Sequence, residues 1–383
     1  MKEIFIQHLI SQYPSLSLEK LNPLISPELL SPYRVELPAS ILSQAQEFIS
    51  AIYSLRRQPS YIQFFDAEIK QRGLIDPGNK SICMSYDFHL DESGVLKLIE
   101  VNTNAAFLAL GAEFYNSLGL AQPIKGFQLK ELKNSIETEM QLFGKNKTNL
   151  NAAIIDEHPQ KQRLYAEFLV YEALMKSWGW QVQVLDFREV RGVDFIYNRH
   201  TDFYLENPES QNLRNKFLNK EICFSPNPFE YLLMADKQRM IDWWSIPQVS
   251  SETIRRHLPE SFSVNQDNLD EAWNKRKKLF FKPKRAFGSK QSYKGASMSR
   301  RIIEDLAAGD FIAQEFIAAP ELEFKANDES IKLLGHSESQ KFKYDLRFYT
   351  YQDQLQMAIA RLYQGQTTNA KTLGGGFAPV IFI

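Results

Sequence analysis

Two carboxylates and an amide near the start of the chain are the residue types that bind hard cations: Asp87, Glu100 and Asn102. The pattern of residues 81–101, with Glu-Ser-Gly near its middle, predicts a β-hairpin. Glu100 and Asn102 then share a face of the second strand, because side chains alternate along a strand. Such an oxygen set suits Mg²⁺, which prefers a few carboxylates together with nucleotide phosphate oxygens.

The alternative for this set is a solvated hairpin that carries its acids on a polar face. One observation favours the metal site. Apolar residues flank Glu100 and Asn102 throughout the segment 98–108, and buried acids normally require a partner.

A basic strand followed by a glycine-containing loop covers residues 279–295. The strand delivers Lys282 to a loop that contains Gly288, Ser289 and Gly295. Such a loop can fold over phosphates, because its backbone N–H groups and the lysine charge both attract them. The segment is not a Walker A motif. A basic surface loop or a contact to a nucleic-acid backbone is the alternative.

An extended apolar segment at residues 311–321 carries two further acids. Its backbone N–H and C=O groups could face an adenine edge, with Glu315 beside the amino group. Glu321, six residues further on, would reach the ribose hydroxyls. A buried strand with incidental acids explains this segment equally well.

Two arginines close to the end of the chain are expected on neighbouring strands. Arg347 and Arg361 flank the turn at 352–354, and Asn369 precedes three glycines at 374–376. Arginines here would stabilise the negative charge that develops when a phosphoryl group is transferred. Surface ion pairing beside a glycine turn is the alternative.

The elements that position these residues divide the chain into four regions. Residues 1–75 are expected to be mostly helical, and the apolar spacing from Leu42 to Ile52 predicts one packed helix face. Strands and helices alternate over 151–200, which predicts a parallel sheet covered by helices. Residues 236–383 combine a short helix, the basic strand, the apolar segment and a terminal antiparallel pair.

Composition excludes several classes of protein. Among 383 residues, 45 Lys and Arg balance 46 Asp and Glu, so no bulk charge favours nucleic acid or an anionic membrane. The two cysteines cannot form a disulfide framework or a zinc site. No apolar run approaches the roughly 20 residues of a membrane span. We therefore expect a cytoplasmic protein with no membrane or nucleic-acid partner.

Taken together and in this order, the segments resemble the ATP-grasp superfamily. Asp236-Lys237 is similar to the helix start from which a first lysine reaches the nucleotide, and Lys282-Pro to the second lysine and its phosphate-covering loop. Gln314-Glu315-Phe-Ile317 is similar to the adenine hinge. The arginine strands and Thr368-Asn369 are similar to the paired strands of amino-acid ligases.

The position of the predicted metal ligands in the chain indicates which branch of this superfamily the sequence resembles. In most members the metal-binding Asp and Glu-x-Asn follow the arginine strands, whereas here Asp87, Glu100 and Asn102 precede them. This order resembles the circularly permuted branch that includes glutathionylspermidine synthase. One departure is Ser85, where that synthase has an arginine; Arg347 or Arg361 would take over its role. The amidase domain sometimes fused to those synthases is also absent.

The resemblance implies an α/β fold with α+β lobes around an ATP-grasp nucleotide site. Its domains would be a helical region at 1–75, a metal-binding half-lobe at 76–150, a Rossmann-like (pre-ATP-grasp) subdomain at 151–235, and nucleotide-binding lobes at 236–383. Asp156-Glu157 and Tyr165 to Phe168 carry the likeness to the subdomain.

The resemblance also implies a reaction, in which ATP and a carboxylate give an acyl phosphate that an amine converts to an amide. The predicted metal ligands are those of the hairpin, for Mg²⁺ or Mn²⁺. Nucleotide-binding residues would be Lys237, Lys282, Gly288, Ser289, Gln314, Glu315, Ile317 and Glu321, and catalytic residues Arg347, Arg361 and Asn369.

Several alternatives stay open at this stage. The same scaffold could be a phosphotransferase, or a non-catalytic nucleotide-binding protein, which the loss of arginine at Ser85 favours. The partners would be a small-molecule or peptide carboxylate and an amine, and a homodimer is compatible with the resemblance. Tyr165, Glu167 and Arg199 are candidates for the acceptor site.

Overall fold

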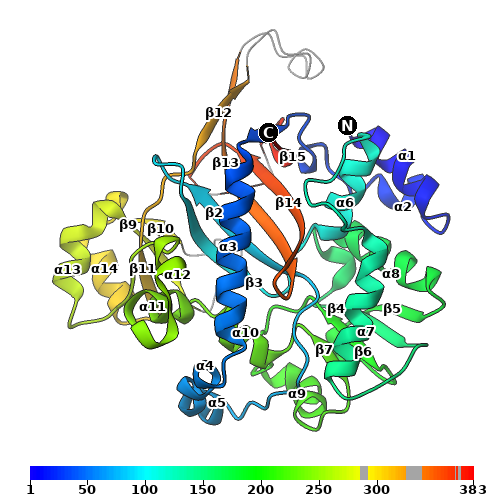
Figure 1. Ribbon diagram of the computed structural model, residues 1–383, viewed down its shortest axis with the longest axis horizontal. Coiled ribbons are helices and arrows are strands. Elements are labelled where there is room, and N and C mark those ends of the chain that lie inside the picture. The colour runs from blue at the N-terminus through cyan, green and yellow to red at the C-terminus, as the bar shows by residue number, and fades with distance from the viewer. Residues whose placement is uncertain (285–291, 325–338, 367, 370–371) are drawn as a thin grey trace.

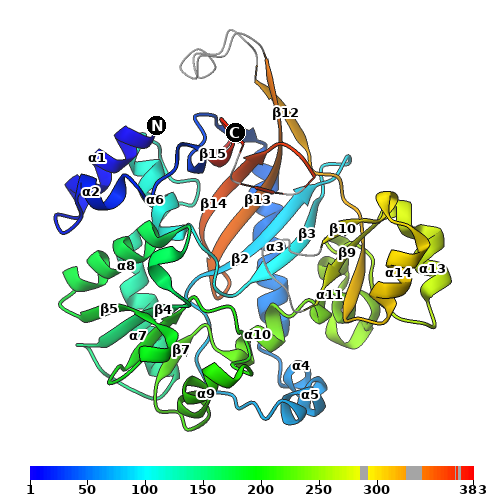
Figure 2. The ribbon, with the colours of Figure 1, turned by 180° about the vertical axis from the view of Figure 1, so that it is seen from behind.

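The computed structural model describes residues 1–284, 292–324, 339–366, 368–369 and 372–383. Within these ranges the chain forms three β-sheets flanked by helices (Figure 1). The central sheet lies between the other two in both ribbon views (Figures 1 and 2). The mixture of sheets and helices confirms the predicted α/β fold class.

The central sheet joins strands from opposite ends of the chain. Its order is β1 (Val35–Leu37), β15 (Gly376–Phe382), β14 (Gln354–Tyr363), β13 (Gln340–Tyr351), β2 (Met84–Leu90) and β3 (Leu96–Asn102), and β12 (Glu321–Phe324) also pairs with β13. The predicted hairpin is confirmed as β2–β3, and the predicted arginine pair as β13–β14. Because β2 pairs with β13, the upstream acids lie directly beside the downstream arginines.

The second sheet is antiparallel and carries Lys282. Its order is β10 (Tyr293–Lys294), β9 (Leu279–Pro283), β11 (Phe311–Glu315) and β8 (Ser261–Val264). Helices α13 (Leu269–Lys275) and α14 (Arg300–Ala307) cover its outer side (Figure 1). Phe281 and Ala313 are fully buried against these helices, so the alternate residue Lys282 faces the other way.

The third sheet is parallel, as the strand–helix alternation predicts. Its order is β5 (Gln181–Asp186), β4 (Asn151–Asp156), β6 (Phe195–Asn198) and β7 (Cys223–Ser225). Its helices are α7 (Leu132–Leu142), α8 (Tyr165–Ser177) and α9 (Gln211–Leu218). Gly179 follows the end of α8 with φ +85°, a left-handed conformation that glycine adopts without strain.

The N-terminal residues are mostly helical, with one exception. They form α1 (Lys2–Gln12), α2 (Leu18–Leu21), α3 (Ala39–Arg56), α4 (Pro59–Phe64) and α5 (Asp66–Gln71). The exception is β1, which extends the central sheet by pairing in parallel with β15, Val35 opposite Val380. Pairing over such a separation depends on a partner strand and has no local sequence signal, so we did not expect it.

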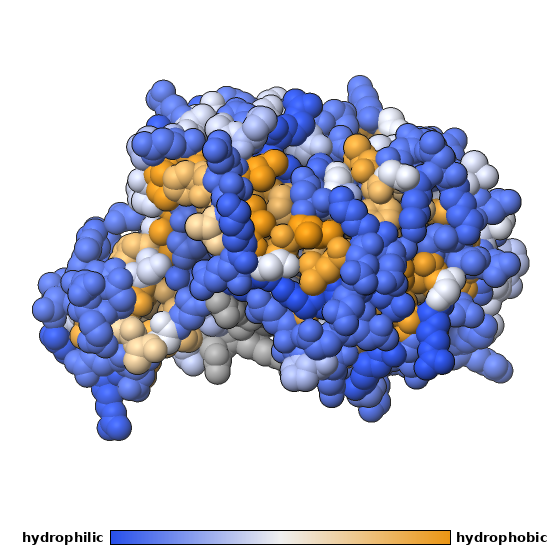
Figure 3. Space-filling model, turned by 90° about the horizontal axis from the view of Figure 1, so that it is seen from below, coloured by the Kyte–Doolittle hydropathy of each residue, from blue (hydrophilic) through white to orange (hydrophobic). Residues whose placement is uncertain are grey.

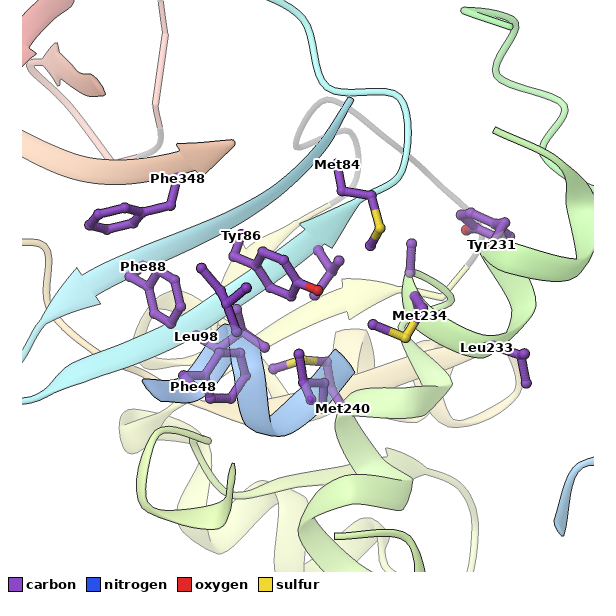
Figure 4. Packing of buried hydrophobic residues seen from close by; sticks show 14 of the residues in the cluster. Phe48, Met84, Tyr86, Phe88, Leu98, Tyr231, Leu233, Met234, Met240 and Phe348 are labelled. Atoms are coloured by element: carbon purple, nitrogen blue, oxygen red, sulfur yellow. The ribbon is translucent and has the colours of Figure 1, made fainter. Parts of the chain in front are cut away.

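The predicted face of α3 packs on one side of the central sheet. Ala45, Phe48, Ile49 and Ile52 are buried there, as their helical spacing indicates. Phe48 makes edge-to-face contacts with Tyr86 and Phe88 of β2 (Figure 4). Side chains of α10 (Pro228–Met234) and α11 (Gln238–Ser245) complete this cluster, and α12 (Glu252–Arg256) contacts α3.

Side chains alternate between the two faces of the sheet along β13 and β14, so every second residue of these strands lies on the face away from α3. Met357 and Ile359 pack there with α6 (Leu108–Ser117). Arg361 continues the same set two residues further on, as does Arg347 two residues before Tyr349. The polar site described below therefore lies on the face of the sheet opposite α3.

Within the described ranges, no helix combines the length and the apolar character that a bilayer span needs. In the view from below, apolar side chains gather in hollows between hydrophilic ones (Figure 3).

Glu139 of α7 is a fully buried carboxyl group that connects the helices of the parallel sheet to the central sheet. Its Oε2 accepts hydrogen bonds from the Lys80 amide (2.6 Å) and Asn79 Nδ2 (3.1 Å), and its Oε1 from the Tyr351 hydroxyl (2.9 Å). Burial outweighs these bonds and raises the pKa of Glu139 to about 7.

Replacing Glu139 with glutamine is expected to increase the free energy of unfolding at pH 8 and to change it little at pH 5. The folded protein keeps a proton that the unfolded chain releases above about pH 4.5, so wild-type stability falls as the pH rises from about 4.5 to 7. The full difference corresponds to about 3 kcal/mol. Urea unfolding at both pH values measures it. Glu137→Gln, on the exposed side of the same helix, is the control, and an equal effect of Glu139→Gln at both pH values would contradict the prediction.

Candidate functional site

A cavity of about 240 Å³ lies between the central sheet and the sheet that carries Lys282. Most of the residues singled out from the sequence line it, although they come from segments far apart in the chain. They are Asp87, Glu100, Lys237, Lys282, Gln314, Glu315, Ile317 and Arg361. The structure thus brings the hairpin acids, the lysines, the apolar segment and one arginine to a single place.

Lys282 is the buried cation of this cavity. Its Nζ donates hydrogen bonds to Gln314 Oε1 (2.8 Å) and to the carbonyl of Ile99 (3.0 Å), which links the second sheet to the central one. Burial lowers the pKa of Lys282 to about 8, although Glu100 and Asp87 favour the charged form. An anion that entered the cavity would restore the full charge of this ammonium group.

A β-bulge shapes the acidic wall. Asp87 pairs with Glu100 and Phe88 with Leu98, so Ile99 has no partner across the hairpin. The bulge leaves the Ile99 carbonyl free to accept from Lys282 and places both Ile99 and Glu100 at the cavity. Asn102 Nδ2 lies 3.3 Å from Glu100 Oε1, in agreement with their predicted common face.

Asp87 is held by two guanidinium groups. Arg347 donates to it through Nε (2.7 Å) and Nη2 (2.6 Å), and Arg361 Nη2 donates at 2.8 Å. Burial alone would raise the pKa of Asp87, but the two arginines outweigh it and lower that pKa to about 2. Ser85 Oγ adds a hydrogen bond at 3.3 Å. Asp87 is therefore ionised and already neutralised by its partners.

These contacts bear on the metal prediction. A cation at Asp87 would have to displace an arginine, whereas Glu100 and Asn102 carry no such ion pair among the described residues. The described ranges contain no group of three or more His, Cys, Asp or Glu placed to hold a metal. Mg²⁺ needs few protein ligands when substrate phosphates supply the others, so Glu100 with Asn102 fits such an ion and Asp87 fits it poorly.

The two predicted arginines occupy different positions. Arg361 lines the cavity, and its Nε donates to Asp345 (2.6 Å), which also accepts from the Thr368 hydroxyl (2.5 Å). Arg347 lies behind Asp87 and does not belong to the cavity wall. Arg361 can therefore contact a ligand in the cavity. Arg347 instead holds Asp87 in place.

The predicted adenine hinge comprises the last two residues of β11 and the two residues after it. Gln314 uses both ends of its amide, accepting from Lys282 and donating to Ser261 Oγ (3.3 Å), so it positions the lysine. The Phe316 N–H donates to the Lys278 carbonyl (2.8 Å), and its ring is stacked against that of Phe280 with centroids 6.3 Å apart and planes inclined by 26°. Phe280 and Phe316 thus add aromatic surface to a cavity that is otherwise lined largely by charged and polar residues.

Lys237 reaches the cavity from the start of α11. The preceding residue, Asp236, accepts hydrogen bonds from the Gln238 amide (2.9 Å) and the Tyr204 hydroxyl (2.5 Å). Tyr204 belongs to the connection between β6 and α9, so this contact fixes the lysine-bearing turn against the parallel-sheet region.

Several predicted residues lie elsewhere. Glu321 is exposed on β12, and Asn369 stabilises its own turn, donating to the Gln364 carbonyl (2.8 Å) and accepting from Thr372 Oγ1 (3.0 Å). Neither lines the cavity, and nor does Asn102. Gly288 and Ser289 lie outside the described residues.

The cavity wall also contains residues that the sequence analysis did not select. His89, Tyr363 and Asp345 each stand two positions from Asp87, Arg361 and Arg347, respectively, on the same strand. Strand alternation applied outward from the selected residues would have found all three.

The fold has counterparts among solved structures. A glutathione synthetase like-effector (GSS30) from Globodera pallida, in its apoform, matches with a TM-score of 0.56 and 12% identity, over 92% of this chain and 90% of that one. A protein from Methylobacillus flagellatus KT, described as a candidate gamma-glutamylcysteine synthetase, matches over 88% and 86% with 9% identity and a TM-score of 0.45, too low to support an argument. No family model and no curated protein matches the sequence.

This chain shares its fold with that glutathione synthetase-like effector. The likeness extends over nearly the whole chain. At such low identity it concerns the fold alone.

A second polar group lies at the carboxyl ends of the parallel strands, where open α/β sheets commonly bind ligands. Burial raises the pKa of Asp156, at the end of β4, to about 6, and Arg199 follows β6. Glu167 is different, because it accepts from the Phe107 (2.7 Å) and Ala109 (3.0 Å) amides. Glu167 thus holds the start of α6, whereas Arg199 stays a candidate for substrate contact.

Proposed function

We propose that this protein is an ATP-dependent ligase that joins a carboxylate to an amine, with Mg²⁺-ATP bound in the cavity between the two sheets. The observation that carries the proposal is the meeting of Lys237, Lys282 and Glu100 at one cavity that Phe280 and Phe316 also line. Lysine charges attract phosphates, aromatic rings suit a base, and Glu100 can hold a cation beside phosphate oxygens.

The proposed reaction has two steps. A carboxylate oxygen attacks the γ-phosphorus of ATP, the bond from that phosphorus to the β–γ bridging oxygen breaks, and ADP leaves. The amine nitrogen then attacks the acyl carbon, the carbon–oxygen bond to phosphate breaks, and the amine loses a proton as inorganic phosphate departs. The products are an amide, ADP and phosphate.

The residues of this chain would bind and orient the reactants. Lys237 and Lys282 hold the phosphates, and Glu100 with Asn102 would hold Mg²⁺, which offsets negative charge on the phosphates. Arg361, fixed by Asp345, faces the cavity where the carboxylate and the transferring phosphoryl group would lie. The likeness to a glutathione synthetase-like protein supports amide synthesis, since glutathione is a peptide.

ATP is expected to bind only weakly without Mg²⁺, and Glu100→Gln is expected to weaken binding in its presence about tenfold or more. Titration calorimetry with ATP, with and without Mg²⁺, measures both effects. Glu92→Gln, on the exposed turn of the same hairpin, is the control and should behave as wild type. If ATP fails to bind, or if Glu100→Gln keeps the full Mg²⁺ dependence, the proposed site is wrong.

Hydroxylamine trapping tests the reaction itself. With ATP and a pool of amino acids and small peptides as carboxylates, a ligase yields hydroxamates, because hydroxylamine intercepts the acyl phosphate. Arg361→Ala should abolish this product. A phosphorylated hydroxyl compound formed instead of a hydroxamate would identify a phosphotransferase.

A further inference from the structure

His89 lines the cavity of the proposed nucleotide site. It lies on β2 two residues beyond Asp87, which places it on the same face and about 7 Å further along the strand. Its ring contacts the segment after β11, where Nδ1 lies 2.8 Å from the carbonyl oxygen of Ile317. His89 thereby connects the central sheet to the predicted hinge.

This contact fixes which ring nitrogen carries the proton. A backbone carbonyl can only accept, so Nδ1 must donate. In a neutral imidazole protonated at Nδ1, Nε2 carries a lone pair. This nitrogen has no hydrogen-bond partner among the described residues, and His89 is partly accessible. The cavity therefore holds an uncommitted hydrogen-bond acceptor.

The contact of His89 with the hinge indicates where the base of a bound nucleotide would lie. Nδ1 of His89 lies beside the Ile317 carbonyl, and Phe280 and Phe316 line the same cavity as Ile317. A purine ring is flat and apolar on its faces, so it belongs against this aromatic surface, and the phosphates belong with Lys237 and Lys282.

We propose that Nε2 of His89 accepts a hydrogen bond from the 6-amino group of adenine and so makes the site selective for ATP over GTP. This inference rests on the proposed nucleotide site. Adenine presents a donor at position 6, whereas guanine presents a carbonyl oxygen there. Guanine would set two acceptors against each other, and a nucleotide without a group at position 6 would leave Nε2 unpaired.

Three nucleotides and one substitution test this assignment. Wild-type protein should bind ATP about tenfold more tightly than purine riboside triphosphate, which lacks the amino group, and should bind GTP more weakly still. His89→Asn keeps a side-chain amide donor that can reach the Ile317 carbonyl but removes the acceptor at the position of Nε2. In this variant the preference for ATP over purine riboside triphosphate should fall to about twofold or less.

The control is His158→Asn, an exposed histidine of the parallel-sheet region whose left-handed backbone (φ 44°) asparagine tolerates. It should keep the wild-type ratio. Equal affinities of the wild type for ATP and purine riboside triphosphate would overturn the role of His89, and so would an unchanged preference in His89→Asn. Both outcomes leave the proposed function intact, whereas failure of every nucleotide to bind removes the nucleotide site itself. The wild-type comparison needs no variant, so a folding defect in His89→Asn cannot hide the answer.

Discussion

Replacing Lys282 with methionine is expected to weaken ATP binding about 100-fold or more. The ammonium group lies at the centre of the proposed phosphate site, and methionine has a similar length but neither charge nor donor. The substitution also removes the contact between the second sheet and the Ile99 carbonyl. Calorimetric titration with Mg²⁺-ATP measures the loss. Lys278→Met, exposed just before the same strand, is the control and should bind as wild type.

The same substitution should separate binding from stability. Because burial holds the pKa of Lys282 at about 8, against 10.5 in an unfolded chain, the folded state gives up a proton that the unfolded state keeps. Wild-type stability therefore rises as the pH increases from about 8 to 10.5, by up to about 3 kcal/mol. Lys282→Met should lack this rise. If the variant instead unfolds far more readily at pH 7, its loss of binding says nothing about phosphate contact.

Replacing Arg347 with leucine is expected to lower the free energy of unfolding by about 3–5 kcal/mol. Its partner Asp87 is 1% exposed and would keep only Arg361, which it shares with Asp345. A buried carboxylate that loses its main partner is costly, because no water replaces the lost contact. Urea unfolding followed by circular dichroism measures the change.

A second substitution separates this effect from a packing defect. Asp87→Asn combined with Arg347→Leu should recover part of the lost stability, because the buried negative charge is then gone. Arg188→Leu is the matched control, since Arg188 also makes a double contact with an aspartate, Asp186, but on the surface. It should lower the free energy of unfolding far less than Arg347→Leu does, because an exposed ion pair contributes little to stability. A double variant no more stable than Arg347→Leu would mean that Arg347 acts through its shape rather than its charge.

The positions of Asp87 and the two arginines also bear on the serine at position 85, where the synthase that the sequence resembles has an arginine. Ser85 pairs with Tyr349 across β2 and β13, and both arginines reach Asp87 from the neighbouring strands. The space over Asp87 therefore holds two guanidinium groups although residue 85 is a serine. A serine at position 85 therefore does not leave the site without positive charge.

Local sequence patterns determined the elements of this fold. The hairpin that carries Asp87 and Glu100 and the pair that carries Arg347 and Arg361 follow from strand patterns and turn residues. The parallel strands from Asn151 onward follow from the alternation of short apolar runs with helical segments. These signals are readable because they depend on neighbours within about ten residues. The types of residue at the site were readable for the same reason, since Lys282 and Gln314 interrupt apolar strands.

Tertiary structure alone decided how those elements meet and which side chains remain free for a ligand. The pairing of β2 with β13 joins residues 260 apart in the chain, and it places Asp87, a predicted metal ligand, in contact with two arginines. The bulge at Ile99 and the contact of His89 with Ile317 likewise arise between distant segments. A sequence records the charge and size of each side chain, but a charge becomes committed or available only through partners that folding brings within hydrogen-bond distance.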